Sequence, residues 1–340
     1  MDTDYDISQI LDEEYENVMS YLATKSSHSI VEHETSIEHD QHPQRKTTPE
    51  NGAQNVGEQS SLKGSKSEIK SLYAVNAACG CCIKWLEIPE TVTIFNSLDE
   101  EYRTVKVARE TYAIVHRITK HDGDENWKTH SLEVNGSRLC SFLAKVLKKY
   151  PGANVGAFQA KFYPPFMSLF HRSKVLLNAT DIELDEETKT QAQLLNKRLI
   201  DYWIPFLEDI VEFEKSGLMA FRSLWTIYPP GWLTVTKIND TVSAAGIQEV
   251  DIGNTLGISV RVINWNGSYC GYETVRHNID AYSGVRKVTD LAIYPLRFSQ
   301  SPQTLVDTLK ERGRKFEALR GFHYKACSSL GPRNVSKSVC

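Results

Sequence analysis

The sequence lacks any long hydrophobic run. Its longest uncharged stretch near the middle, Ser223 to Thr236, has 14 residues and contains two prolines and a glycine, whereas a membrane-spanning helix needs about 20 apolar residues. The N-terminus, Met1–Asp6, is acidic, with no apolar stretch after basic residues, so it resembles neither a secretory signal nor an Arg-rich transit peptide. We therefore expect no membrane contact and a cytoplasmic or nuclear location.

Cysteine is scarce, with seven residues in 340, and an odd number in a chain without a signal argues against a disulfide framework. Three lie close together, at Cys79, Cys81 and Cys82. Neighbouring thiolates can bind zinc, and Cys140 or His116 could complete a tetrahedral site. This spacing is not the usual Cys-x-x-Cys, however, so we favour a thiol cluster without metal, with redox sensing as a variant. We expect no cofactor.

Aromatic residues are absent from Thr24 to Lys70. Residues 1–70 carry 14 acidic against six basic side chains, a charge of -8, whereas the remaining 270 residues carry +4. Such a polar segment buries too little apolar surface to offset chain entropy. We therefore predict a disordered linker over 24–71.

Before this linker, apolar residues recur at intervals of three and four, which predicts a short acidic amphipathic helix within residues 1–23. These residues are Ile7, Leu11, Tyr15, Val18 and Leu22. Such a helix is marginal alone. It could dock on the body of the chain, bind a partner's groove or have no stable structure.

The body that follows alternates apolar runs with turn signals, and we divide it into halves at 72–216 and 217–327, with a tail at 328–340. The first half is expected to hold strands, a hairpin and three helical regions. The second half is expected to hold five short strands and a final helix that starts at Pro302. This order predicts an α+β fold, with a small antiparallel sheet or partly open barrel in the C-terminal half. The expected strands are 91–95, 104–108, 112–118, 129–134, 220–228, 233–238, 257–265, 269–275 and 291–298, and the expected helices are 137–147, 167–178 and 185–216.

Several short strings of the body look familiar when they are read together. They are Phe142-Leu-Ala-Lys-Val-Leu147 with Tyr150-Pro-Gly152, Pro165-Phe166 with Leu169-Phe-His-Arg172, Leu224-Trp-Thr226 with Pro230-Gly231, Tyr294-Pro-Leu296, Arg312-Gly-Arg-Lys-Phe316 and Leu319-Arg-Gly-Phe-His-Tyr-Lys325. Together with the cysteine cluster, they resemble the uncharacterised domain that precedes the ATPase module in a family of fungal AAA+ ATPases. The resemblance covers about Ala74 to Lys325.

The resemblance implies a domain of unknown biochemical activity that accompanies an ATP-driven motor in its relatives. The present sequence contains no Gly-x-x-x-x-Gly-Lys-Ser/Thr loop to hold phosphates, so we expect no enzymatic activity from it. We read it as a non-catalytic interaction or regulatory domain that recognises a protein substrate or adaptor. One alternative is a fragment of a protein-remodelling ATPase whose motor is missing. The other is a nucleic-acid-binding module.

The nucleic-acid alternative rests on basic residues near the C-terminus that alternate with aromatic ones. These residues are Lys310, Arg312, Arg314, Lys315, Arg320, His323 and Lys325. A basic last helix also suits its own C-terminal dipole, and the sequence pI is about 6.2. We therefore favour a surface that contacts a protein partner or an ATPase module. The oligomeric state stays open.

Three further patterns contribute less to the prediction of function. Asp122, Asp124, Asn126 and Glu133 fit part of a calcium loop, but Trp127 stands where that loop requires glycine. We therefore discard calcium. His171 lies beside aromatic residues, and we single it out as the histidine that could line a pocket. For the three tryptophans Trp225, Trp232 and Trp265 we expect a place in the core of the second half rather than in a binding cage.

Overall fold

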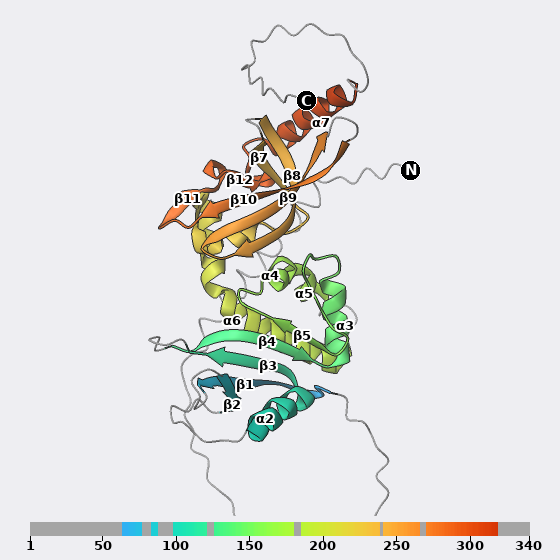
Figure 1. Ribbon diagram of the computed structural model, residues 1–340, viewed down its shortest axis with the longest axis vertical. Helices are drawn as coiled ribbons and strands as arrows, with labels where there is room; N and C mark the ends of the chain where they lie inside the picture. Colours follow the sequence, from blue (N-terminus) through green and yellow to red (C-terminus); the bar gives the residue numbers. More distant parts are fainter. Residues whose placement is uncertain are drawn as a thin grey trace, which may run out of the picture.

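The computed structural model describes residues 63–76, 83–87, 98–120, 126–179, 185–238, 241–265 and 270–318. Two five-stranded sheets lie one above the other along the long axis, and the helix α6 runs between them (Figure 1). The predicted acidic helix at 1–23, most of the linker, the strand at 91–95 and the tail at 328–340 lie outside the described residues.

The first sheet has the order β2-β1-β3-β4-β5. β1 and β3 are parallel, and the chain passes from β1 through β2 and then α2 to reach β3. All other neighbouring strands of this sheet are antiparallel. β3 is buried along almost its whole length, because it lies at the centre of a sheet that is covered on both faces. The elements are β1 (Lys66–Asn76), β2 (Ile83–Leu86), α2 (Leu98–Thr111), β3 (Tyr112–Thr119), β4 (Lys128–Asn135) and β5 (Gln159–Phe162).

Helices cover the two faces of this sheet differently. On one face, Ala108 of α2 packs against Leu72 and Val115. The other face forms the larger first core, in which Ile114 and Leu132 meet apolar residues of α3 and α6. The helices on this side are α3 (Ser137–Val146), α4 (Met167–His171), α5 (Ser173–Ala179) and α6 (Glu186–Ser216).

α6 is the long helix of the fold. Its N-cap is Asp185, whose carboxylate accepts a hydrogen bond from the backbone N–H of Thr188, and its C-cap is Gly217 with φ 69°. These are the capping residues that helix ends favour. The N-terminal part of α6 supplies Leu199 to the first core and the C-terminal part supplies Phe213 to a second core. The helix therefore belongs to both halves.

The second core lies against the second sheet, which has the order β10-β9-β8-β7-β12 and is antiparallel throughout. A two-stranded sheet of β6 and β11 lies beside it, and none of the described residues of the final helix α7 is buried. The elements are β6 (Leu218–Ala220), the 3-10 helix η1 (Phe221–Ile227), β7 (Leu233–Ile238), β8 (Thr241–Ile252), β9 (Thr255–Trp265), β10 (Cys270–Asp280), β11 (Val285–Lys287), η2 (Val288–Asp290), β12 (Ile293–Pro295), η3 (Leu296–Phe298) and α7 (Pro302–Ala318). The α+β prediction, with an antiparallel sheet in the C-terminal half, is confirmed. None of the described helices is long and apolar enough to cross a membrane.

Some predicted elements are wrong in detail. Residues 66–71, assigned to the linker, begin β1, because pairing with distant β3 gives this polar stretch a partner. Residues 104–108 lie in α2, although they are rich in β-branched residues, because Val105 and Ala108 face the sheet at a helical interval. Residues 220–228 form mainly η1, and only 293–295 of 291–298 form a strand.

Candidate interaction sites

A buried carboxylate lies on the face of the first sheet that carries α2. Glu133 of β4 has no exposed side-chain surface, and its oxygens meet three cations from three elements. Arg109 of α2 donates from Nε to Oε2 at 2.9 Å and from Nη2 to Oε1 at 3.2 Å. Arg117 of β3 places Nε 3.0 Å from Oε1, and Nζ of Lys161 on β5 lies 3.7 Å from the same oxygen. We call these four residues the Glu133 cluster.

The charged groups of the Glu133 cluster shift one another's pKa values. Burial alone would raise the pKa of Glu133, but the hydrogen bond from Arg109 and the charges of Arg117 and Lys161 bring it below its usual value. Burial lowers the pKa of Arg117, whereas the hydrogen bond to Glu133 raises that of Arg109. At neutral pH the cluster thus carries three positive charges against one negative, and the side chains of Arg109 and Lys161 are 43% and 32% exposed.

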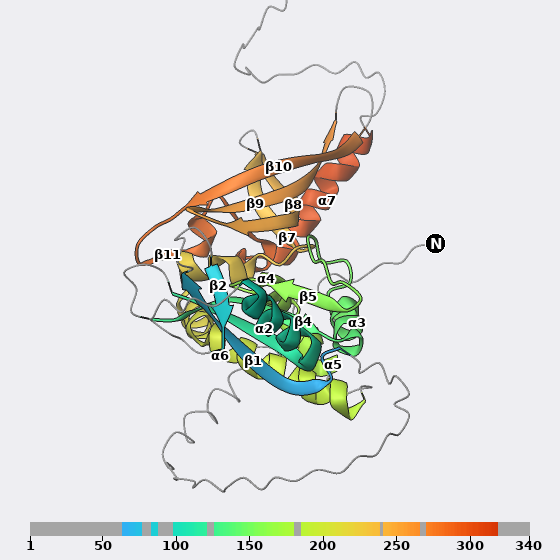
Figure 2. The same cartoon turned by 60° about the horizontal axis from the view of Figure 1, so that its bottom comes forward.

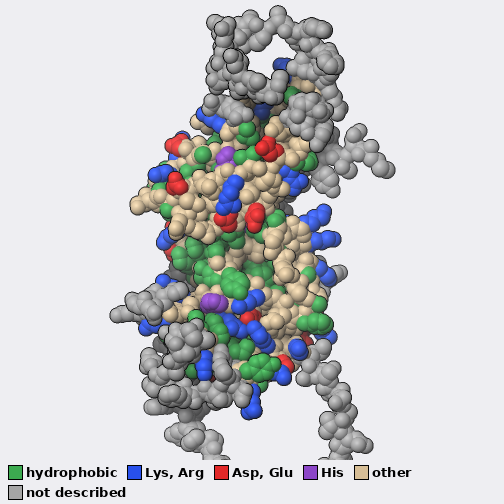
Figure 3. Space-filling model, in the orientation of Figure 1, with side chains coloured by type: hydrophobic (Ala, Val, Ile, Leu, Met, Phe, Trp, Pro, Cys, Tyr) green, Lys and Arg blue, Asp and Glu red, His purple; other side chains and the backbone are tan. Residues whose placement is uncertain are grey.

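Aromatic rings surround these cations. The guanidinium of Arg117 lies over the Trp85 ring at 4.7 Å, and Nζ of Lys161 lies over the Tyr163 ring at 4.9 Å. His130 bridges the two aromatic residues, with ring centroids 5.2 Å from Trp85 and 5.9 Å from Tyr163. Figure 3 shows Lys and Arg side chains beside hydrophobic ones on the face of the first sheet that carries α2. The combination favours a ligand that is both acidic and apolar.

The second sheet presents an apolar pair on the face turned away from its core. Ile263 of β9 and Tyr272 of β10 lie directly opposite each other, and they are 73% and 74% exposed. Arg261 lies over the Tyr272 ring at 5.1 Å. β10 is the outermost strand, and no described element pairs with its free side (Figure 2).

One glycine shapes this outer face. Arg276 of β10 reaches across β9 to Asp251 of β8, with Nη2 2.8 Å from the carboxylate. The bridge passes over Gly257, where an added Cβ would collide with the guanidinium. Without a side chain at this position, Arg276 lies inward over the sheet instead of standing along the free side of β10.

Comparison with known protein families gives a match to the region of the second sheet. Residues 209–300 match the family described as "Domain of unknown function (DUF7025)". No curated protein and no solved structure matches the chain. The DUF7025 match runs from the last part of α6 to just after η3, so it includes the exposed pair and β10. The Glu133 cluster lies before it in the chain.

α7, just after the DUF7025 match, carries the basic residues singled out in the sequence. Arg312 donates to the backbone oxygen of Val242 at 2.6 Å and so fastens α7 to β8. Arg314 and Lys315 both approach Glu311, at 3.4 Å and 3.8 Å. Lys310 is exposed. The remaining residues of the set, Arg320, His323 and Lys325, lie outside the described residues.

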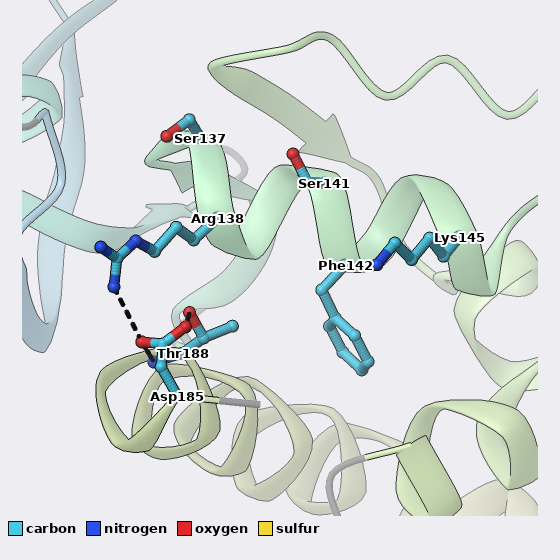
Figure 4. A pocket seen from close by; sticks show the side chains of 7 residues that line it. All are labelled: Ser137, Arg138, Ser141, Phe142, Lys145, Asp185 and Thr188. Atoms are coloured by element: carbon cyan, nitrogen blue, oxygen red, sulfur yellow. Dashed lines mark hydrogen bonds and ion pairs between the residues drawn. The ribbon is translucent and has the colours of Figure 1, made fainter. Parts of the chain in front are cut away.

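A shallow hollow opens between α3 and the start of α6, with a volume of about 280 Å³ (Figure 4). Arg138 and Lys145 of α3 line it together with Asp185 and Thr188. Asp185 accepts hydrogen bonds from both Thr188 groups and from Arg138 at 3.1 Å. Its carboxylate therefore serves mainly as the cap of α6.

His171 joins the first half of the body to the region of the DUF7025 match. Its Nε2 donates to the backbone oxygen of Trp225 at 2.9 Å, so its Nδ1 accepts from the Tyr150 hydroxyl at 2.8 Å. Burial lowers the pKa of His171 to about 4. The ring is therefore neutral at pH 7 and packs between the two halves.

The three tryptophans have different surroundings. Trp225 is buried, as predicted, although it lies on η1 rather than on a strand. Trp232 packs against the second core. The guanidinium of Arg297 lies over the Trp232 ring, 4.2 Å from the ring centroid. The side chain of Trp265 lies outside the described residues.

The predicted metal ligands Cys79, Cys81 and Cys82 also lie outside the described residues. Both side chains proposed to complete their site are engaged elsewhere. Cys140 is buried and points its thiol at the backbone oxygen of Val134, and burial raises its pKa to about 11. His116 contacts Thr129 and Arg198. Among the residues that the structure describes, no three His, Cys, Asp or Glu side chains are grouped as a metal site.

The Glu133 cluster could not be predicted from the sequence. There Glu133 fits only the last position of a calcium loop, whereas the structure shows it on β4 among basic side chains. Arg109 and Arg117 are 24 and 16 residues away from Glu133 along the chain. An acidic residue between two apolar ones, Leu132 and Val134, was the available signal, since a charge is rarely buried without a partner.

Proposed function

We propose that this chain is a non-catalytic protein-recognition module in which the free side of β10 pairs with an extended segment of a partner protein. The observation that carries the proposal is the length of this open edge. β10 has 11 residues, whereas the other outermost strands of the two large sheets, β2, β5 and β12, have four, four and three.

A long open edge is unusual because it presents unpaired backbone N–H and C=O groups to any other strand. Proteins commonly shorten such edges or place a charged side chain along them. Here the basic residue Arg276 is held across the sheet by Asp251 instead. Strand addition uses these backbone groups for affinity and side-chain contacts for specificity.

The exposed pair beside the edge supplies such a side-chain contact. Tyr272 belongs to β10 itself and Ile263 to its neighbour, and both face away from the core. A partner strand next to β10 would place every second side chain on this same face. We therefore expect the partner segment to carry an apolar residue that packs on Tyr272.

The resemblance to the region preceding the motor of fungal AAA+ ATPases supports a finer form of the proposal. In that form the partner is a substrate or adaptor protein of such a motor. The DUF7025 match lies inside the span of the resemblance, and β10 lies inside both.

The test selects binding peptides from a random library against the full chain. Affinities are then measured by fluorescence polarisation for the wild type, the double variant Ile263→Ser/Tyr272→Ser and the control Phe158→Ala. Phe158 is 66% exposed and lies near the first sheet. We expect the double variant to weaken binding about thirtyfold, as loss of a central aromatic contact worth about 2 kcal/mol does, and the control to leave it unchanged.

A second measurement separates strand addition from simple apolar contact. Methylating alternate backbone nitrogens of a selected peptide removes the donors that a paired strand uses, while its side chains stay the same. Strand addition predicts that one methylation pattern abolishes binding and the alternate pattern does not. Equal binding of both methylated peptides, or selection of no peptide that depends on Tyr272, would contradict the proposal.

A further inference from the structure

The cations around Glu133 extend along one side of α2. Arg103 and Lys106 precede Arg109 at intervals of three, which places them on neighbouring turns of the same side of the helix. Both are exposed. Arg109 at the end of this row meets Lys161 of β5 at Glu133, and Nζ of Lys161 lies over the Tyr163 ring, which is 55% exposed. We call these residues, with the Glu133 cluster, the α2 surface.

A segment of the same chain has the complementary chemistry. Residues 1–24 contain seven Asp and Glu residues and no Lys or Arg. Their apolar residues recur at helical intervals, which predicts one apolar and one acidic face. Such a segment would meet cations with its carboxylates and aromatic rings with its apolar side chains.

The connection between this segment and the α2 surface is short enough to favour an encounter. Thirty-eight residues separate Thr24 from Lys63, which directly precedes β1 of the first sheet. A flexible chain of this length has a typical end-to-end distance of about 35 Å. Tethering over such a distance gives an effective concentration in the millimolar range, so even a weak contact would be populated.

The basic residues of α7 fit the acidic segment less well. Arg312 is engaged with the backbone of β8, and Arg314 and Lys315 share Glu311. The α2 surface instead has an excess of positive charge and several aromatic rings together.

We propose that the acidic N-terminal segment, residues 1–24, docks on the α2 surface of its own chain. The contact joins its carboxylates to Arg103, Lys106, Arg109 and Lys161 and its apolar face to Tyr163. An acidic partner protein that used this surface would have to displace the segment first. This inference is independent of strand addition at β10, because it concerns the other sheet.

The test uses photocrosslinking in the full-length chain. The variant Tyr163→p-benzoylphenylalanine places the crosslinker on the α2 surface, and the control Tyr272→p-benzoylphenylalanine places it on the second sheet. Peptide mapping at high dilution should find adducts to residues 1–24 from position 163 and none from position 272. Raising the salt concentration from about 0.05 M to about 1 M should reduce these adducts about tenfold, since exposed charges are then screened within a few ångströms.

Charge variants test the electrostatic part without disturbing the buried carboxylate. Arg103→Gln/Lys106→Gln should reduce the adducts from position 163, as should Asp12→Asn/Glu13→Gln/Glu14→Gln/Glu16→Gln in the segment itself. The matched control Lys310→Gln/Lys315→Gln on α7 should leave them unchanged. Equal adducts from both crosslinker positions, no adduct from position 163, or adducts that ignore salt and these substitutions would overturn the proposal.

Discussion

Replacing His171 with glutamine should change how the stability of the protein depends on pH. The buried ring is neutral, and protonating it in the folded state is costly because burial lowers its pKa to about 4. The ordinary pKa of histidine is about 6.5. The unfolded chain therefore binds a proton between these two values and the folded chain does not, so stability is lost as the pH falls from about 6.5 to about 4.

The size of the effect follows from these two pKa values. Between a pH above 6.5 and a pH below 4, the shifted pKa of His171 lowers the free energy of unfolding by about 3 kcal/mol. Between pH 7 and pH 5 the decrease is about 2 kcal/mol. Glutamine does not titrate, but it offers one donor for the backbone oxygen of Trp225 and one acceptor for the Tyr150 hydroxyl. His171→Gln should therefore lower the free energy of unfolding by about 1 kcal/mol at pH 7. The variant should not show the decrease of about 2 kcal/mol that His171 causes in the wild type between pH 7 and pH 5.

Urea unfolding at pH 7 and pH 5 measures the effect, with Tyr150→Phe as the control. This control removes one hydrogen bond but leaves the buried imidazole able to titrate, so it should keep the wild-type decline between the two pH values. An undiminished decline in His171→Gln would show that His171 is not a neutral buried ring and would refute the reasoning.

Three further substitutions test other parts of the fold. Glu133→Gln should lower the free energy of unfolding by about 3 kcal/mol at pH 7, because a buried cation loses its counter-charge. Urea unfolding should show this difference narrowing as the pH falls below about 4, because the unfolded wild-type chain then binds a proton at this carboxyl before the folded chain does, where the pKa of Glu133 is lowered. Gly257→Ala should displace Arg276 and lower the melting temperature only slightly, since the ion pair is exposed, and thermal unfolding should show a smaller decrease in an Arg276→Ala background. Gly64→Ala should cost more, about 2 kcal/mol in urea unfolding, because φ is 69° and the new Cβ would lie 2.7 Å from the backbone oxygen of Asn135; no loss there would contradict the assigned backbone conformation.

Elements with strong local signals were predicted correctly from the sequence. Helix α3 follows an unbroken helical stripe, and α6 starts at Asp185 and ends at Gly217, both of which are typical of helix ends. The hairpin of β3 and β4 was predicted from two β-rich runs that an acidic turn separates. In each case neighbouring residues carry the information.

Elements that depend on distant partners were not predicted. β8 is rich in small and polar residues and gives no strand signal alone, but β7 and β9 pair with it on both sides. The start of β1 has the same character and becomes a strand by pairing with β3. The Glu133 cluster was missed for the same reason, since its charges come from three elements that only the folded sheet brings together.

The shared helix α6 has a consequence for how the chain can be divided. The DUF7025 match begins at residue 209, well inside this helix of 31 residues. A fragment of residues 209–300 would keep only its last eight residues, fewer than an isolated helix needs for stability. It would also lose Phe206 and Leu207, which contact both cores. The region that recurs between sequences is therefore smaller than the unit that folds, and we expect autonomous folding only when the fragment begins ahead of Asp185.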